Sequence, residues 1–333
     1  MPFVWVCKHC RGPGIPGRAD YKPWTKCPNC GNFYDADRVS VHEGEVAGAQ
    51  RQPVIEGEVN SMMDIIADAA DNPQASTIDT RMSGVNWVLG EGIPIEAAIL
   101  LAAFPGGGKT TLLVELFRKL ALGTDKHESI DVLLIQTEES AKQIGRRYAR
   151  LGAFPPRFGL VHEAKFSDIL ELLEKRKPQV AAIDSLSKLE GVTDSNGFVF
   201  SIGSQASVSL AAMQLKKFAA ENEMTIFCTG HSTKEGAIAG SNTLIHDLDM
   251  TLYIDGRTEL MRGRPVLVGE DRVLECQGKN RFGADGRRAL LSMRSDGLHD
   301  RGPLSAEAYA ELKATWNESS RKAAQEAKKS VRA

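Results

Sequence analysis

The pattern of apolar and polar positions changes at about Thr77. From there, short apolar runs alternate with longer segments in which apolar residues recur every three or four positions. Short apolar runs bounded by glycine or polar residues predict buried strands, and the longer period predicts amphipathic helices. The expected strands are 97–104, 131–137, 180–185 and 224–230, and the expected helices are 111–123, 140–152, 166–177 and 209–223. This alternation indicates βαβ units, and therefore an α/β domain with a twisted, mainly parallel sheet.

The apolar runs after residue 250 follow one another without helical segments between them. They cover residues 251–255, 266–271, 272–278 and 289–295. We expect these runs to be antiparallel strands that complete the sheet. From Ser305 the chain is rich in Ala, Lys, Glu and Arg, which predicts a helix with a polar tail.

The chain before Thr77 has a weaker pattern. Residues 35–76 contain few large apolar residues and no sustained period, which is typical of a linker. The sequence therefore predicts four parts: a small cysteine-rich unit at 1–34, a linker at 35–76, the α/β domain at 77–298 and a helical tail at 299–333.

Composition restricts the classes of function only in part. Charged residues make up 25% of the chain and hydrophobic residues 42%, as in ordinary globular proteins. No apolar run is long enough to span a membrane, and the N-terminus lacks the pattern of a signal peptide, so we expect a cytoplasmic protein without a membrane partner. The net charge of -2 argues against a protein that coats nucleic acid over its whole surface. It does not argue against contact through a few loops or a central channel.

Four of the six cysteines form two CxxC pairs near the N-terminus, Cys7 with Cys10 and Cys27 with Cys30. Paired CxxC knuckles place four thiolates at the spacing of a tetrahedral Zn²⁺ site, so residues 1–34 are predicted to be a zinc ribbon. The loop between the pairs carries basic residues and Trp24, which suit contact with either nucleic acid or protein. Cys228 and Cys276 lie singly in apolar runs and are interpreted as core residues.

The segment Pro105–Thr110 has the sequence PGGGKT and lies between an expected strand and an expected helix. Glycines allow backbone N–H groups to surround phosphates, a lysine reaches the β- and γ-phosphates, and the following hydroxyl ligates Mg²⁺. We therefore predict an ATP-binding P-loop that includes Pro105, Gly106, Gly107, Gly108, Lys109, Thr110 and Thr111. The usual leading glycine of the motif is Ala103 here, where the strand ends and a small residue suffices.

A P-loop also needs carboxylates at the ends of neighbouring strands. Asp184 follows four apolar residues and is predicted to hold Mg²⁺ together with Thr110. The strand at 131–137 is followed by Glu138 and Glu139, and one of them is expected to orient the attacking water. We favour Glu138 as this base, with Glu139 as the alternative, because a glutamate there also suits the first turn of the next helix.

Taken together, these segments resemble the bacterial RadA (Sms) branch of the RecA-like ATPases. The resemblance rests on the cysteine pairs, PGGGKTTLL, EESAKQIGRRYARLG, AAIDSL, TGHSTKEGAIAGS and KNRFG, in that order over residues 1–298. It implies a RecA-like ATPase with ATP, Mg²⁺ and Zn²⁺ that acts on single-stranded or branched DNA in recombination and repair. It also implies a hexameric ring and a recombinase as candidate partner.

The same resemblance implies roles for individual residues. His231 would sense the γ-phosphate, and Lys234 would lie in a DNA-binding loop, where a cation and flexible backbone suit single-stranded DNA. Lys279 and Arg281 would act on ATP bound by the neighbouring subunit, as an arginine finger and its partner. The alternatives are a core or surface histidine, a solvated Lys234 and a structural ion pair at 279–281.

The resemblance has one gap, because the family continues into a C-terminal domain similar to the Lon protease and this sequence ends at Ala333 without it. Hexamer stability and DNA affinity are the implied properties that this difference affects most. Three other functions remain open: a DnaB-type replicative helicase, a KaiC-like regulatory ATPase without a DNA role, and a recombination mediator that only binds.

Overall fold

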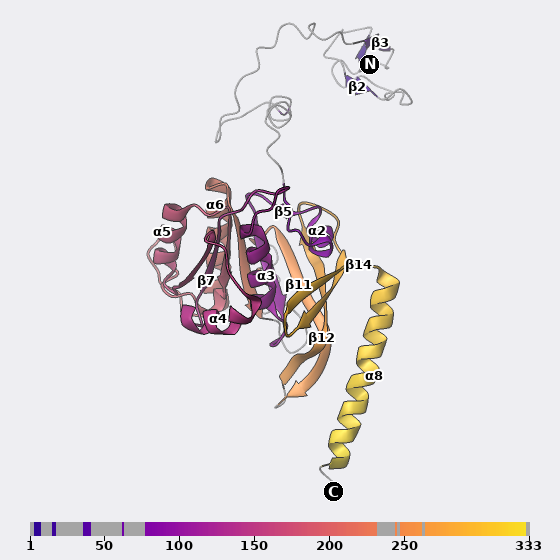
Figure 1. Cartoon of the computed structure of the whole chain (residues 1–333). Helices are drawn as coiled ribbons and strands as arrows, with labels where there is room; N and C mark the ends of the chain where they lie inside the picture. Colours follow the sequence, from indigo (N-terminus) through magenta and orange to yellow (C-terminus); the bar gives the residue numbers. More distant parts are fainter. Residues whose placement is uncertain are drawn as a thin grey trace. The chain divides into compact units, whose positions relative to one another are not determined.

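The computed structural model describes residues 3–7, 15–17, 36–40, 62, 77–231, 244, 247–261 and 264–330 (Figure 1). The chain divides into two compact units, Met1–Gln74 and Ala75–Ala333. In the described ranges, no helix is long and apolar enough to cross a membrane.

The described part of the first unit is a small antiparallel sheet. Its strands are β1 (Phe3–Cys7), β2 (Ile15–Gly17) and β3 (Ala36–Ser40), in the order β2-β1-β3. The third strand therefore comes from the stretch predicted as linker. Cys7 ends β1, whereas Cys10, Cys27 and Cys30 lie outside the described residues, so the zinc ribbon stays a prediction. Where the structure is described, no three His, Cys, Asp or Glu residues group to hold a metal ion.

The second unit contains the large sheet that the pattern predicted. In the described residues it has nine strands in the order β14-β13-β12-β11-β6-β10-β9-β7-β8. The strands from β11 to β8 in this order pair in parallel. They are β6 (Ala98–Ala103), β7 (Val132–Gln136), β8 (Phe158–His162), β9 (Val180–Asp184), β10 (Thr225–His231) and β11 (Met250–Met261). The α/β fold with a mainly parallel sheet is confirmed.

The remaining strands of this sheet are antiparallel, as expected from the absence of helices between them. They are β12 (Arg264–Asn280), β13 (Arg288–Arg294) and β14 (Gly297–Leu304). Two of the expected runs, 266–271 and 272–278, belong to the single long strand β12. The sheet continues past residue 298, and the helix α8 (Ala306–Ser330) follows it.

Helices cover both faces of the parallel part, because alternate residues of each strand point to opposite faces. In β6, Ile99 and Leu101 belong to one buried cluster, and Ala98 and Leu100 belong to the other. The first cluster packs against α2 (Ser83–Leu89), α3 (Lys109–Ala121) and α4 (Ala141–Tyr148). The second packs against α5 (Phe166–Arg176) and α6 (Gln205–Glu221). In Figure 1 these helices lie on the two sides of the sheet.

The remaining elements are short. The strands β4 (Thr77–Ile78) and β5 (Ile93–Pro94) pair with each other before the central strand begins. Single 3₁₀ turns follow α4 at Ala149–Leu151 and β9 at Leu186–Lys188. Since the strands from β6 to β9 are parallel, the residues after their carboxyl ends meet at one edge of the sheet.

Candidate nucleotide-binding site

The loop Pro105–Gly108 leaves the carboxyl end of the central strand β6 and enters α3. Gly108 precedes the helix with φ of 89°, a conformation that glycine adopts without strain. A Cβ on Gly107 would lie 2.5 Å from Cβ of Ala103 and 2.9 Å from the carbonyl oxygen of Phe104. Ala103 therefore ends the strand, as predicted, and the loop turns so tightly that Gly107 has no room for a side chain.

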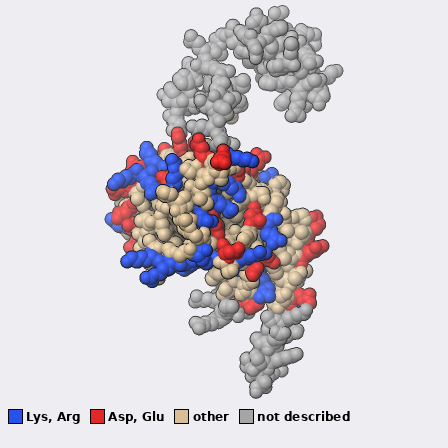
Figure 2. Space-filling model, in the orientation of Figure 1, with Lys and Arg blue, Asp and Glu red and all other residues tan. Residues whose placement is uncertain are grey.

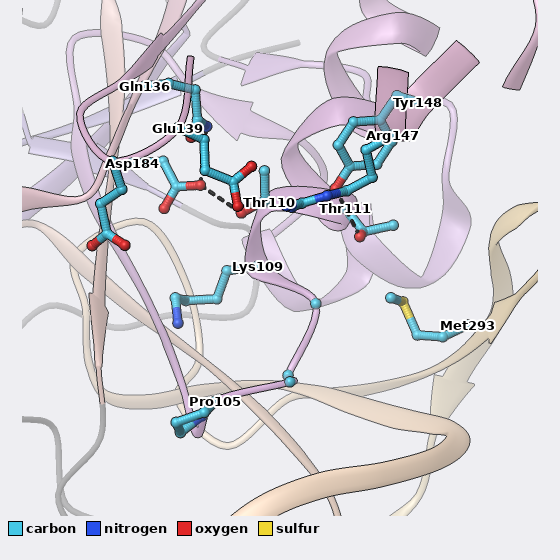
Figure 3. Close-up of a pocket in the computed structure, with 14 residues that line it drawn as sticks. Pro105, Lys109, Thr110, Thr111, Gln136, Glu139, Arg147, Tyr148, Asp184 and Met293 are labelled. Carbon is cyan, nitrogen blue, oxygen red and sulfur yellow. Dashed lines mark hydrogen bonds and ion pairs between the residues drawn. The ribbon is translucent and has the colours of Figure 1, made fainter. Parts of the chain in front are cut away.

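Lys109 is the first residue of α3 and is buried, with 9% of its surface exposed. It lines a cavity of about 350 Å³ at the carboxyl edge of the sheet (Figure 3). Burial lowers the pKa of its ammonium group, and the carboxylates of Asp184 and Glu138 act in the opposite direction. The lysine is thus a buried cation near two acids, and an anionic ligand in the cavity would compensate the cost of its burial.

Asp184 ends β9 and lies at the centre of a hydrogen-bond network. Its Oδ2 atom accepts hydrogen bonds from Thr110 Oγ1 at 2.5 Å and from Gln136 Nε2 at 3.1 Å. Its Oδ1 atom accepts one from Thr229 Oγ1 at 2.6 Å. Donors from three elements, α3, β7 and β10, therefore hold this carboxylate beside the hydroxyl of the loop. The structure brings Thr110 and Asp184 together as the sequence predicted, whereas Gln136 and Thr229 were not foreseen.

Glu138 and Glu139 follow β7 but are held differently. Glu138 Oε1 accepts a hydrogen bond of 2.9 Å from Ser185 Oγ, and its charge acts on Lys109. Glu139 forms an ion pair with Arg147 of α4 at the rim of the cavity. Both glutamates line the cavity, so the structure keeps both candidates near the loop. Glu138 is thus held by Ser185 and its charge acts to raise the pKa of Lys109, whereas Glu139 is paired with Arg147 of α4.

The other end of the cavity contains Thr111 of the predicted loop, together with three residues that the sequence did not single out: Arg147, Tyr148 and Met293. Thr111 Oγ1 and Tyr148 Oη are 3.0 Å apart. Figure 3 shows Tyr148 and Arg147 beside Thr111, on the opposite side of the cavity from Asp184. Met293 comes from β13, far along the chain, and no local pattern marks it as a pocket residue.

The strand β12 lies against the phosphate loop and forms hydrogen bonds with its backbone. Leu267 N donates a hydrogen bond of 3.0 Å to the carbonyl oxygen of Pro105. Arg272 donates from its NH2 atom to the carbonyl oxygen of Gly106 at 3.3 Å, and burial lowers the pKa of its guanidinium. The antiparallel part of the sheet thus fixes the position of the phosphate loop.

Lys279 and Arg281 lie at the opposite edge of the sheet from the loop. Asn280, between them, pairs with Met250, and Asp249 donates its N–H to the carbonyl oxygen of Ala98 at the amino end of β6. Because β6 spans six residues, its two ends are separated by roughly 17 Å. Neither cation therefore joins the cavity of its own chain. Lys279 is in β12, and Arg281 follows the end of that strand.

The last two predicted residues are only partly described. His231 ends β10, and its backbone pairs with Ala103 beside the start of the loop. Lys234 lies outside the described residues. The roles assigned to these two residues stay predictions.

The arrangement fits a nucleotide and a magnesium ion. Gly108 precedes the free N–H groups of the first turn of α3, which attract anions, and the Thr110 hydroxyl beside the Asp184 carboxylate is an oxygen donor pair of the kind that Mg²⁺ prefers. Strand, glycine loop, buried lysine and strand-end carboxylates define a P-loop nucleoside triphosphatase domain.

Comparison with known proteins narrows this class. Residues 68–237 match the family model described as "AAA domain". The chain is 32% identical over 302 residues to the DNA repair protein RadA of Streptococcus pyogenes serotype M6, covering 89% of this chain and 58% of the relative. It is 28% identical over 295 residues to that of Bacillus subtilis and 27% identical over 300 residues to that of Haemophilus influenzae. The chain belongs to the AAA domain family and is RadA-like.

The chain spans about 58% of the length of the curated relatives that it matches. The relatives carry the RadA name and favour neither a DnaB-type helicase nor a KaiC-like regulator. The resemblance found in the sequence motifs is therefore confirmed at the level of the family.

Proposed function

We propose that this chain is the motor domain of a RadA-type DNA repair ATPase, which hydrolyses ATP with Mg²⁺ in response to single-stranded or branched DNA. The observation that carries the proposal is the convergence of Lys109, Thr110, Asp184 and Glu138 in one cavity. The relatives named DNA repair protein RadA support the biological context.

Each residue has a role that its position supports. Lys109 neutralises the phosphates, and Thr110 and Asp184 hold Mg²⁺, which supplies charge neutralisation at the phosphate oxygens when bound. Glu138 accepts a proton from the attacking water, with its carboxylate oriented by Ser185. Thr229 connects Asp184 to β10, so a change at the cavity reaches Gly230 and His231 and the segment that contains Lys234.

We further propose that the active unit is a ring, in which Lys279 and Arg281 of one copy complete the site of the next. Their distance from the loop of their own chain supports action on a neighbour. On the face shown in Figure 2, Lys and Arg alternate with Asp and Glu, with a basic group at the lower left near α4. A face of mixed charge does not attract DNA over its whole extent, so the proposed DNA contact is made through loops or a channel. A cytoplasmic location, a zinc ribbon on Cys7, Cys10, Cys27 and Cys30, and a recombinase partner belong to the same proposal.

The test measures phosphate release with and without single-stranded DNA, together with the mass of the particle in ATP. We expect hydrolysis that DNA stimulates, a mass of several subunits, and loss of hydrolysis in Lys109→Ala by about 100-fold or more. Lys217→Ala is the control, because this lysine of α6 is exposed on the surface.

A monomer whose ATPase rate does not respond to DNA would overturn the motor, and would favour the KaiC-like alternative. Absence of hydrolysis with retained nucleotide binding would favour a mediator that only binds. Unwinding of a forked duplex without a recombinase would favour the helicase.

A further inference from the structure

The cavity has two chemically different ends. Lys109, Asp184 and Glu138 occupy one end, where charge is concentrated. The other end has Thr111 and Tyr148, with Met293 opposite the loop. The acidic end fits the terminal phosphate and its metal, so a bound nucleotide extends toward Thr111 with its first phosphate and nucleoside.

Tyr148 reaches this end because of the way α4 is built. Ser140 and Gln143 form a capping box that fixes the start of the helix directly after Glu139. Ile144 and Tyr148 are four residues apart and form the buried face of α4. The tyrosine is therefore held by core packing and is only 2% exposed, although its hydroxyl reaches the cavity.

In the contact between Tyr148 Oη and Thr111 Oγ1, either hydroxyl can be the donor, so a phosphate that accepts from Thr111 leaves the Thr111 oxygen free to accept from Tyr148. The Tyr148 phenol carries a proton at neutral pH, as tyrosines ordinarily do, and can donate it, and burial raises its pKa further. When Tyr148 donates to Thr111, the hydrogen of Thr111 is directed away from the tyrosine, toward the cavity. A threonine without such a partner can turn its hydroxyl back to the carbonyl groups of its own helix.

We propose that Tyr148 is a positioning residue for nucleotide binding: it orients the Thr111 hydroxyl as a donor to the first phosphate of the bound nucleotide. The proposal rests on the proposed function, since it requires that the loop binds a nucleotide. It assigns Tyr148 to binding and not to cleavage, because the contact lies at the end of the cavity away from Glu138 and Asp184.

The test compares Tyr148→Phe with the unchanged chain, using equilibrium binding of ADP and of a non-hydrolysable ATP analogue, and ATP turnover. One lost hydrogen bond predicts roughly three- to ten-fold weaker binding. The factor is expected to be equal for both nucleotides, because they share the first phosphate. We expect the turnover rate at saturating ATP to stay within about two-fold of that of the unchanged chain. The reason is that the hydrogen bond to the first phosphate is equally strong in the ground state and the transition state.

Two further variants separate positioning from a merely structural role. In a Thr111→Val background, Tyr148→Phe should cause no additional loss of nucleotide affinity. In a Thr111→Ser background, which keeps the hydroxyl, Tyr148→Phe should weaken binding as it does in the unchanged chain. Tyr309→Phe is the matched control: Tyr309 also donates to a partner, Asp255 Oδ2 at 2.5 Å, but lies in α8 away from the cavity. It should lower thermal stability without changing nucleotide affinity.

The outcomes distinguish this inference from the proposed function. If the unchanged chain binds neither nucleotide, the proposed function fails. If the unchanged chain binds both nucleotides, three results for Tyr148→Phe would contradict the role of Tyr148. These are affinities equal to those of the unchanged chain, weaker binding of the ATP analogue alone, and a lower turnover rate with unchanged affinities. If Tyr148→Phe does not fold, the Thr111 pair decides: equal affinity in Thr111→Val and Thr111→Ser overturns the inference.

Discussion

Each end of the central sheet has a buried aspartate beside cations, but the cations differ in exposure between the two ends. At the carboxyl edge, Lys109 and Asp184 are each 9% exposed, and hydrogen bonds from three neighbours hold the aspartate. At the amino edge, the Arg281 side chain is 57% exposed, and its ion pair with Asp249 has a length of 3.4 Å. Lys216 approaches the same carboxylate at 2.6 Å.

This difference in exposure indicates that Lys109 binds a ligand within its own chain, whereas Arg281 is accessible from outside. A buried, fully bonded carboxylate keeps a fixed geometry, which a metal and a phosphate require. An exposed arginine beside other cations can reorient toward a new anion at little cost. Lys279 is half-buried beside these cations, and desolvation together with the charges of Arg281 and Lys216 lowers the pKa of its ammonium.

The largest expected effect concerns the amino edge. We expect Arg281→Ala to reduce ATP hydrolysis by about 10³-fold or more, as for the loss of an arginine finger, with nucleotide affinity almost unchanged. Phosphate release and ADP binding measure the two quantities. Arg287→Ala is the matched control, because Arg287 lies in the same loop but stacks on Trp87.

A mixture of Arg281→Ala and Lys109→Ala chains tests whether the arginine acts on a neighbour. Some interfaces in the mixture combine an intact loop with an intact arginine, so part of the activity should return. If the mixture is no more active than its parts, Arg281 does not act on the ATP of a neighbouring chain.

The next largest effect concerns the carboxyl edge. We expect Glu138→Gln to lower turnover by about 10²–10⁴-fold while ATP remains bound, because the amide cannot accept the proton of the attacking water. Glu139→Gln should cost less, since this carboxylate is engaged with Arg147. Single-turnover hydrolysis compares the two, and a larger loss in Glu139→Gln would reverse the assignment of the base.

The smallest effect concerns the carboxylate that organises the amino edge. Lys216→Ala should lower the free energy of unfolding by about 1 kcal/mol, because Asp249 is 5% exposed and loses its nearest cation. Lys217→Ala, at the adjacent exposed position, should change it by less than about 0.5 kcal/mol. Urea denaturation measures both, and equal values would show that the Asp249 cluster is only a solvated surface.

Much of the fold was predictable because its signals are local. Strands such as Val180–Asp184 appear in the sequence as apolar runs ending in a polar residue, and the helices between them keep a clear period. The expected end of the α/β domain at residue 298 was less well predicted, because the sheet continues into β14 (Gly297–Leu304). This strand is rich in polar residues and joins the sheet by pairing with β13. β3 was likewise assigned to the linker, because the strand ADRVS is short and polar.

The sequence by itself determined the phosphate loop, because PGGGKT between a strand and a helix restricts the backbone to one kind of anion cradle. It also determined that Asp184 and a glutamate after β7 would lie nearby, since parallel strands end at one edge. Only the tertiary structure decided that Tyr148, Met293 and Arg272 belong to the same site, and that Arg281 lies at the far edge. Those relations depend on the order of the strands and on packing between segments far apart in the chain, which no local pattern records.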